Sequence, residues 1–243
     1  MKNFLICAPT YNESENIEIF CKKIFKINKN FHLLIIDDNS PDGTYKIVEK
    51  IKLKYKNLYL LKRKKKLGLG SALREGMTYA LKKKYKALMT IDADLSHNPK
   101  EIPLLIYKLK SNDFVIGSRY ISGGKSDYTG YRNLISRLAN KLCRFILNMP
   151  FNEFTTSFRI YNDKCLKVLK NASLKSDGYS SQIEFFYYVY MKGLKCKEVP
   201  INFKHRFKGN SKIPRLQAFY SALKLIELFF KKFFIKKNNY REN

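Results

Sequence analysis

The feature that most constrains this chain is an apolar run over residues 87–91 that ends in Asp92 and Asp94, with one alanine between them. An apolar run of this length is typical of a buried strand. A helix start follows at once, because Asn98 can cap a helix and Pro99 suits its first position. Open α/β sheets bind ligands at the carboxyl ends of their strands. We therefore expect both carboxylates at the mouth of such a sheet.

Two carboxylates this close together repel each other, and a cation between them relieves the repulsion. Residues two apart in an extended chain point to the same side, so Asp92 and Asp94 can reach one ion. The hard divalent ions Mg²⁺ and Mn²⁺ prefer such oxygen ligands. The structural alternative is that the pair only ends a strand and caps a turn, since short motifs of this kind often occur without function.

Other apolar runs have the same form along the first half of the chain. Polar residues follow each run and helical patterns separate them; the runs span residues 4–8, 33–36, 58–61, 87–91 and 114–116. We expect Asn12 and Ser40 to begin the helices after the first two runs. This alternation predicts an α/β fold with a mostly parallel central sheet flanked by helices. Glu13, Asp37 and Asp38, like Asp92 and Asp94, come after predicted strands. On that topology we expect the acidic side chains to share one crevice.

Basic residues far outnumber acidic ones, with 48 lysines and arginines against 20 aspartates and glutamates and a formal net charge of +28. Such a charge attracts nucleic acid, anionic lipid headgroups or phosphorylated substrates. A nucleic-acid-binding protein gives no reason for acidic clusters at three strand ends, where phosphates are repelled. We therefore expect phosphorylated substrates and a membrane surface as partners, and no nucleic acid.

The 243 residues suit one large α/β domain followed by a tail. We place the domain over residues 1–213 and a basic amphipathic helix over residues 214–243. In the tail, apolar residues recur at helical spacing with lysines between them. This pattern fits a helix in a membrane interface, and equally a helix packed on the protein's own core or on a partner.

The sequence also bears on the compartment of the protein. No window reaches the roughly 18 uninterrupted apolar residues of a transmembrane helix, and the start has no features of a signal peptide. The five cysteines show neither metal-ligand spacing nor a disulfide framework, which favours a reducing compartment. We expect a peripheral protein on the cytoplasmic side of a membrane, without a transmembrane helix.

Taken together, these motifs resemble the family-2 glycosyltransferases, which have a nucleotide-diphosphosugar-binding fold of the GT-A type. Within that family the chain looks most like the dolichyl-phosphate or polyprenyl-phosphate mannose synthases, and the similarity runs from residue 4 to about residue 213. The matching segments are residues 8–13, 36–44, 67–70, 92–97, 117–120, 155–159, 178–184, 198–201 and 206–212.

The resemblance implies roles for individual residues. Those implied to line the nucleotide pocket are Pro9, Tyr11 and Glu13. Ile36 and Asp38 are implied to contact the nucleotide base, and Asp92 and Ala93 are implied to lie beside the ribose and diphosphate. Asp94 is implied as the main metal ligand and Ser96 as a second one. At Ser96 some relatives carry glutamine, which is a better metal ligand.

The basic residues of the motifs are implied to hold phosphates. Those that match the family's phosphate-binding cations are Arg119, Arg206 and Lys212. Arg132 and Ser136 fall where the family's loop-and-helix segment approaches the acceptor phosphate. Glu153 is a departure, because relatives usually carry aspartate at that position.

The implied reaction moves mannose from GDP-mannose to a polyprenyl phosphate, with Asp94, Arg119 and Arg206 as catalytic groups. A divalent ion held by Asp94 neutralises the leaving diphosphate in such a reaction. No histidine has the partners of a catalytic triad. We interpret His97 as a helix cap or as a residue that supports the site. The acceptor phosphate, whose second pKa is near ~6, is already anionic and needs no general base. In-line attack on the anomeric carbon then gives β-mannosyl phosphate.

Two alternatives remain open from the sequence. The same fold could use UDP-glucose or UDP-N-acetylglucosamine as donor, or it could bind without turnover. The lysine-rich run over residues 62–66 we interpret as solvated surface. A small membrane subunit and a second copy of the chain are both candidate protein partners.

Overall fold

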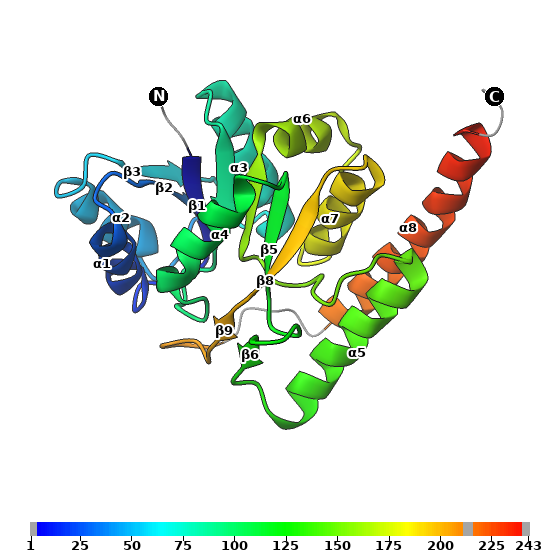
Figure 1. Cartoon of the computed structure of the whole chain (residues 1–243). Coiled ribbons are helices and arrows are strands. Elements are labelled where there is room, and N and C mark those ends of the chain that lie inside the picture. Colours follow the sequence, from blue (N-terminus) through cyan, green and yellow to red (C-terminus); the bar gives the residue numbers. More distant parts are fainter. Residues whose placement is uncertain (1–3, 211–215, 240–243) are drawn as a thin grey trace.

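The computed structural model describes residues 4–210 and 216–239. Its centre is a seven-stranded sheet with the strand order β3-β2-β1-β4-β7-β5-β8 (Figure 1). The strands are β1 (Phe4–Thr10), β2 (His32–Asp37), β3 (Leu58–Lys62), β4 (Ala87–Thr90), β5 (Phe114–Ser118), β7 (Arg159–Asn162) and β8 (Cys196–Pro200). All of them except β7 run in the same direction. The predicted α/β fold with a mostly parallel sheet is confirmed.

Helices cover both faces of this sheet, and alternate residues of β1 enter two different cores. Ile6 and Ala8 belong to a core shared with α1 (Ile17–Ile27), α2 (Thr44–Lys52) and α4 (Ile102–Leu109). Leu5 and Cys7 belong to a core shared with α3 (Leu69–Lys82), α5 (Gly130–Leu147), α6 (Asp163–Asn171), α7 (Ser181–Met191) and α8 (Gln217–Asn239). A strand buried on both faces needs a continuous apolar run, which is the pattern that predicted it.

The antiparallel strand β7 lies between β4 and β5 and was not predicted. Four residues that begin with an arginine give no apolar run. Arg159 is nevertheless fully buried, and its guanidinium donates to three backbone carbonyls. Because β7 is antiparallel, the segment before it, residues 153–158, arrives at the carboxyl end of β4. That edge of the sheet is where Asp92 and Asp94 follow.

Two helices begin later than predicted. α1 starts after Asn16 instead of Asn12, and α2 starts after Gly43 instead of Ser40. Asn12 has a left-handed φ of 57°, and the Ser40 hydroxyl donates to Asp37 at 2.6 Å. Both predictions were wrong, because these polar residues build loops at the sheet edge. The third predicted start is confirmed, since the Asn98 side chain accepts the N–H two residues on and caps the short helix η1 (Pro99–Glu101).

A second, two-stranded sheet joins β6 (Lys125–Ser126) to β9 (Asn202–Phe203). It connects the glycine-rich loop after β5 with the segment after β8. Backbone bonds at 2.9 Å on both sides of the pair, from Lys125 to Ile201 and from Asp127 to Phe203, extend this connection. The glycine-rich loop after β5 is therefore fixed to the chain that leads to Arg206.

The helix α8 packs with its lysines toward the protein. Lys224 Nζ donates to the fully buried Glu184 of α7 at 3.2 Å, and Lys231 Nζ donates to the Tyr188 hydroxyl at 3.1 Å. Lys232 Nζ donates to the last carbonyl of α5 at 3.1 Å. Between these lysines, Leu225 and Leu228 complete the core of the same face.

The predicted apolar stripe of α8 faces away from the body. Its exposed members are Leu216, Phe219, Leu223, Ile226 and Phe230. Exposed apolar residues of α5 add to this surface, among them Tyr131, Leu134, Leu138, Leu142 and Phe145. The two helices lie against each other, so we call their exposed apolar residues the α5/α8 face (Figure 1). Within the described residues, no helix has both the length and the apolar content that a membrane span requires.

Candidate active site

The loops that follow β1, β2 and β4 meet at one edge of the sheet, because these strands are parallel neighbours. The Thr10 hydroxyl donates to Asp37 Oδ2 at 3.0 Å, and the Asp38 N–H donates to the Thr10 carbonyl at 3.0 Å. The Glu13 N–H donates to Thr44 Oγ1 at 2.9 Å. These bonds fix the first two loops to each other.

Arg206 connects the first of these loops to the third. Its Nη2 lies 2.5 Å from Glu13 Oε1 and 3.7 Å from Asp94 Oδ2. Desolvation opposes the charge of this guanidinium, but the hydrogen bond to Glu13 and the Asp94 carboxylate together raise the pKa of Arg206. The expected gathering of acidic side chains at this edge of the sheet is thus confirmed for Glu13 and Asp94, while Asp38 pairs with Arg63 instead.

Asp94 lies in a tight turn whose next residue, Leu95, has a φ of 64°. One carboxylate oxygen, Oδ1, accepts the N–H of Ser96 at 3.0 Å and its hydroxyl at 2.6 Å. The other oxygen, Oδ2, faces Arg206. The carbonyl of Asp94 also accepts the N–H of Phe207 at 2.9 Å, which ties the turn to the Arg206 segment. Ser96 thus orients Asp94, and its predicted role as a metal ligand stays a prediction.

Asp92 has a similar division between its two oxygens. Oδ1 accepts the Ser157 hydroxyl at 2.5 Å, and Oδ2 lies 3.6 Å from His97 Nδ1. The side chain of Asp92 is about one third exposed, at 36%. Ala93 between the two acids is buried and packs in the core of the α1, α2 and α4 face. Asp92 and Asp94 therefore each present one carboxylate oxygen that is not bonded to a neighbouring hydroxyl.

His97 has the supporting role that we interpreted from the sequence. Its Nδ1 accepts the Asp92 N–H at 3.3 Å, and its Nε2 lies 3.0 Å from the Thr156 hydroxyl. The ring stacks on Phe158 and meets the edge of Phe203. Burial lowers the pKa of His97 even though the nearby carboxylates oppose that shift, so the imidazole is neutral near pH 7.

Arg119, at the end of β5, is held by Glu153. Its Nε and Nη2 lie 2.7 and 2.8 Å from the two Glu153 oxygens, and Nη2 also lies 2.8 Å from Thr155 Oγ1. The rings of Tyr120 and Phe203 lie about 5 Å from the guanidinium carbon. Burial raises the pKa of Glu153, but Arg119 and two backbone N–H donors outweigh it, and the net pKa is lowered. Both groups are therefore charged although they are almost fully buried.

The predicted acceptor residues lie beside this pair, at the start of α5. Ser136 accepts the Tyr120 hydroxyl at 2.6 Å, and Arg132 is exposed to solvent. Tyr128 is on the loop between them and Arg119, with its ring 5.2 Å from that of Phe203. Burial raises the pKa of Tyr128, Asp94 raises it further, and Arg119 and Arg132 lower it. Tyr128 therefore lies within electrostatic reach of both Asp94 and the two arginines Arg119 and Arg132.

At the opposite side of the crevice, Asp38 pairs with a residue that the sequence reasoning missed. The buried Arg63 contacts Asp38 Oδ1, and its Nη1 donates to Ser71 at 2.9 Å. Asp38 Oδ2 accepts the N–H groups of Leu67 and Gly68 at 3.0 Å. The prediction that the run over residues 62–66 is solvated surface is therefore wrong at Arg63. Arg63 is the only arginine of this run, and that difference was the one sequence signal of its separate role.

Two predicted pocket residues are partly exposed, and a third is buried. Pro9 and Tyr11 are partly exposed, and Lys66 lies 4.1 Å from the centre of the Tyr11 ring. The side chain of Ile36 is fully buried in the core with Cys7, so it cannot line an open pocket. The whole residue is 0% exposed and its carbonyl accepts the Thr10 hydroxyl at 3.4 Å, so the structure gives no support to the predicted base contact.

Tyr179 is a further crevice residue that the sequence reasoning did not single out for a role. Burial raises the pKa of Tyr179, and the Asp92 and Asp94 carboxylates raise it further. Its hydroxyl is therefore protonated at neutral pH and is available as a hydrogen-bond donor. Lys212, predicted to bind phosphate, lies outside the described residues. Among the described side chains, no three acidic, histidine or cysteine groups come together as a complete metal site.

This architecture and crevice are those of a glycosyltransferase with a GT-A-like fold. A solved glucosyl-3-phosphoglycerate synthase from Mycobacterium tuberculosis superposes with a TM-score of 0.69 at 18% identity, over 93% of this chain and 80% of that one. A mannosyltransferase from Pyrobaculum calidifontis, solved with GDP-Man and Mn²⁺, gives a TM-score of 0.56 at 14% identity, over 86% of this chain and 58% of that one. At these identities the likeness establishes the fold alone.

The chain belongs to glycosyl transferase family 2, whose model matches residues 5–169. Among curated relatives, the polyprenol monophosphomannose synthase of Mycolicibacterium smegmatis is 34% identical over 86% of this chain and 80% of its own length. The undecaprenyl-phosphate mannosyltransferase of Micrococcus luteus is 31% identical over 86% of each chain. The resemblance inferred from the motifs is thus confirmed, and the protein is a hexosyltransferase of this family.

Proposed function

We propose that this protein transfers mannose from GDP-mannose to a polyprenyl phosphate, with inversion at the anomeric carbon. The crevice that joins Glu13, Asp94 and Arg206 is the observation that carries the proposal, because a nucleotide diphosphosugar needs charge neutralisation at this sheet edge. The names of two relatives, which describe mannosyl transfer to polyprenyl carriers, support the sugar and the acceptor.

The acidic residues fit a divalent cation that is shared with the substrate. Asp92 and Asp94 each have one oxygen held by a hydroxyl and a second oxygen turned elsewhere. Two carboxylates with diphosphate oxygens and water form the kind of site that Mg²⁺ and Mn²⁺ occupy in phosphate-transfer enzymes. Such an ion supplies Lewis-acid stabilisation of the leaving diphosphate. Asp94 is the residue that we expect to hold it, with Arg206 beside the same phosphates.

The described acceptor side of the site has cations, and its buried candidate bases are already bonded. His97 is neutral and occupied, and Glu153 is bonded to Arg119, so neither is placed to remove a proton. A phosphate monoester is already an anion and attacks without losing a proton. Arg119 and Arg132 position that phosphate in the proposal, and the Tyr120–Ser136 bond holds the start of α5 beside them.

Purified protein offered a panel of nucleotide sugars with a polyprenyl phosphate tests the donor. We expect turnover of GDP-mannose with Mg²⁺ or Mn²⁺ and formation of a β-linked mannosyl phosphate. The alternative donors are UDP-glucose and UDP-N-acetylglucosamine, since some structural neighbours were solved with UDP or UDP-GlcNAc. Turnover of UDP-sugars alone would refute the mannose assignment and leave the family intact.

A Glu153→Gln variant tests whether the pairing with Arg119 matters for the acceptor. The neutral amide cannot hold the guanidinium at both oxygens, so we expect kcat/KM to fall by roughly tenfold to a hundredfold. The acceptor KM should rise more than the donor KM, because Arg119 lies on the acceptor side. Glu153→Asp should retain part of the activity, and Glu49→Gln on the exposed surface of α2 is the matched control. Equal changes in both KM values would contradict this role.

We also propose that the protein is peripheral to a membrane and that the α5/α8 face contacts the lipid surface. On α8, Lys224 and Lys231 bond to the protein while Leu223, Ile226 and Phe230 are exposed, which is an unfavourable orientation in water. An exposed face of this size marks an interaction surface. A small membrane subunit or a second copy of the chain are the alternative occupants.

A paired substitution on α8 tests membrane contact. Leu223→Ser with Phe230→Ser should lower co-flotation with lipid vesicles by at least about tenfold, since each buried apolar side chain contributes about 1.5–3 kcal/mol. Both side chains are about half exposed, at 48% and 57%, so folding should be unaffected. Leu53→Ser at the end of α2, 89% exposed, is the control. Unchanged flotation would assign the face to a protein partner.

A further inference from the structure

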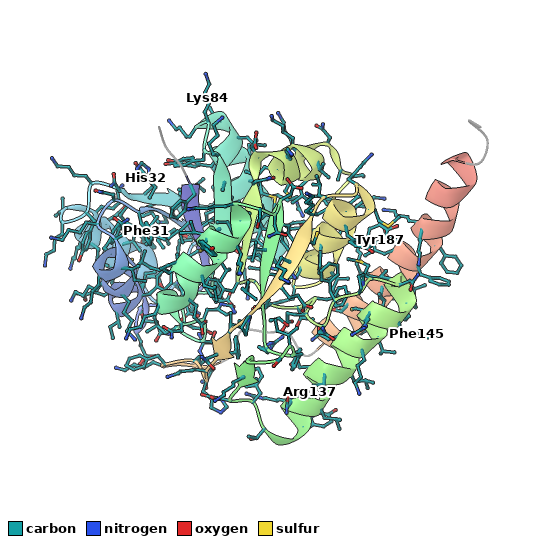
Figure 2. All side chains as sticks on the ribbon, viewed as in Figure 1. Phe31, His32, Lys84, Arg137, Phe145 and Tyr187 are labelled. Carbon is teal, nitrogen blue, oxygen red and sulfur yellow. The ribbon has the colours of Figure 1, made fainter. Side chains whose placement is uncertain are left out.

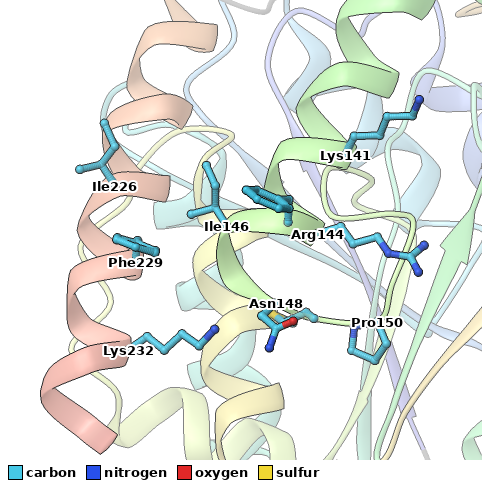
Figure 3. Close-up of a pocket in the computed structure, with 10 residues that line it drawn as sticks. Lys141, Arg144, Ile146, Asn148, Pro150, Ile226, Phe229 and Lys232 are labelled. Atoms are coloured by element: carbon cyan, nitrogen blue, oxygen red, sulfur yellow. The ribbon is translucent and has the colours of Figure 1, made fainter. Parts of the chain in front are cut away.

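A groove of about 950 Å³ lies between the C-terminal end of α5 and the middle of α8 (Figure 3). The apolar part of its wall comes from Phe145 and Ile146 of α5, Met149 and Pro150 of the following loop, and Ile226 and Phe229 of α8. It lies between the two helices of the α5/α8 face. An elongated apolar chain is the shape that such a wall accommodates.

The rest of the wall is basic. Lys141 and Arg144 of α5 and Lys232 of α8 line the same groove, and no acidic residue is among its described lining residues. Two of the three cations are held in place: Arg144 Nη1 donates to Asn152 Oδ1 at 2.7 Å, and Lys232 Nζ donates to the Leu147 carbonyl at 3.1 Å. A ligand that matches this wall has one anionic group and an apolar chain.

The groove is separate from the proposed catalytic crevice. Ser136, which bonds to Tyr120 beside the acceptor-side arginines, is on α5, and Arg144 follows it eight residues later. At about 1.5 Å per residue, that spacing is roughly 12 Å along the helix. The phosphate of an acceptor bound beside Ser136 is therefore out of reach of Arg144. Arg144 matches a second anionic headgroup.

We propose that this groove binds one anionic phospholipid of the membrane surface, separately from the polyprenyl acceptor. Its phosphate lies beside Lys141 and Arg144, and an acyl chain lies against Phe145, Ile226 and Phe229. Such a lipid fills the space between α5 and α8 and gives the enzyme a preference for anionic membranes. The proposal goes beyond the transfer reaction, and its test needs no sugar donor.

Binding of dihexanoyl phosphatidylglycerol below its micelle concentration tests for a discrete site, with dihexanoyl phosphatidylcholine as the neutral comparison. Calorimetric titration of the full chain should show saturable binding of one phosphatidylglycerol and at least tenfold weaker binding of phosphatidylcholine. Lys141→Gln with Arg144→Gln should weaken the anionic lipid about 30-fold, since each cation near a lipid surface contributes about fivefold.

Two further variants separate the groove from general charge. Ile226→Trp fills the apolar wall at a half-exposed position and keeps every cation, and it should also abolish saturable binding. Lys82→Gln with Lys83→Gln removes the same charge at the end of α3, where Lys84 lies far from Phe145 (Figure 2), and should bind like the parent. Farnesyl phosphate serves as a short acceptor-like competitor and should not displace the phospholipid from the groove.

Three results would each overturn the proposal. They are the absence of saturable binding, equal binding of the two lipids, and unchanged binding by the Lys141/Arg144 and Ile226 variants. Full displacement by farnesyl phosphate would assign the groove to the acceptor instead. Mannosyl transfer is measured in parallel, so a failure of the lipid site and a failure of the proposed reaction give different patterns.

Discussion

Replacing Asp94 with asparagine should lower glycosyl transfer by at least about 10²–10³-fold and remove most of its dependence on a divalent cation. An asparagine oxygen can still accept both bonds from Ser96, so the turn should keep its shape. What the variant loses is the negative charge of Oδ2, the oxygen that faces Arg206 across 3.7 Å. The rate and the metal response should therefore fall together while the fold is retained.

Initial rates measured against Mn²⁺ concentration, for the parent and for Asp94→Asn, decide this prediction. Asp163→Asn on α6 is the control, because its carboxylate only pairs with Lys167 one helical turn away. Thermal unfolding of all three proteins shows whether any loss is structural. Turnover by Asp94→Asn that still rises with Mn²⁺ would place the cation at another residue, with Asp92 the nearest candidate.

The positions of the acidic residues could be predicted because local patterns determined them. β1, β2 and β4 are buried on both faces, so each is a short apolar run that ends visibly in polar residues. Once these strands are parallel and adjacent, Glu13, Asp38 and Asp94 must follow at one edge. Their position at this edge follows from the parallel topology, which the alternation of strands and helices already indicates.

The groups that hold the crevice could not be predicted, because each depends on contacts between distant parts of the chain. Glu153 and Arg119 are in contact although they are 34 residues apart in the sequence, and Arg63 and Asp38 are 25 residues apart. Arg63 differs from the lysines around it only in being an arginine, and that signal does not say which distant carboxylate it meets. The segment around Glu153 reaches the site only because β7 is antiparallel, and β7 had no sequence signal.

The orientation of α8 is a related case, because spacing defined its faces and could not say which one was inside. Lys224 shows that the packed side of α8 includes a lysine. This residue is 8% exposed, and its Nζ lies 3.2 Å from Glu184, which is fully buried. Glu184 also accepts the N–H groups of Lys175 and Ser176, in the loop that leads to Tyr179. The tail helix is thereby linked to a loop of the candidate active site.

Lys224→Ala should lower the free energy of unfolding by about 3–5 kcal/mol, since it leaves the Glu184 carboxylate buried without its cation. For a chain of this size, that corresponds to a Tm decrease of at least roughly 6 °C. Circular dichroism melts of the variant and of Lys50→Ala on the exposed surface of α2 measure the difference. Combining Lys224→Met with Glu184→Gln should recover much of the loss, because no buried charge then remains and the amide still accepts backbone N–H groups.

If Lys224→Ala melts like Lys50→Ala, α8 is not part of the folded core. Removal of residues 214–243 would then test membrane contact alone, whereas a large Tm decrease means that such a deletion also destabilises the enzyme.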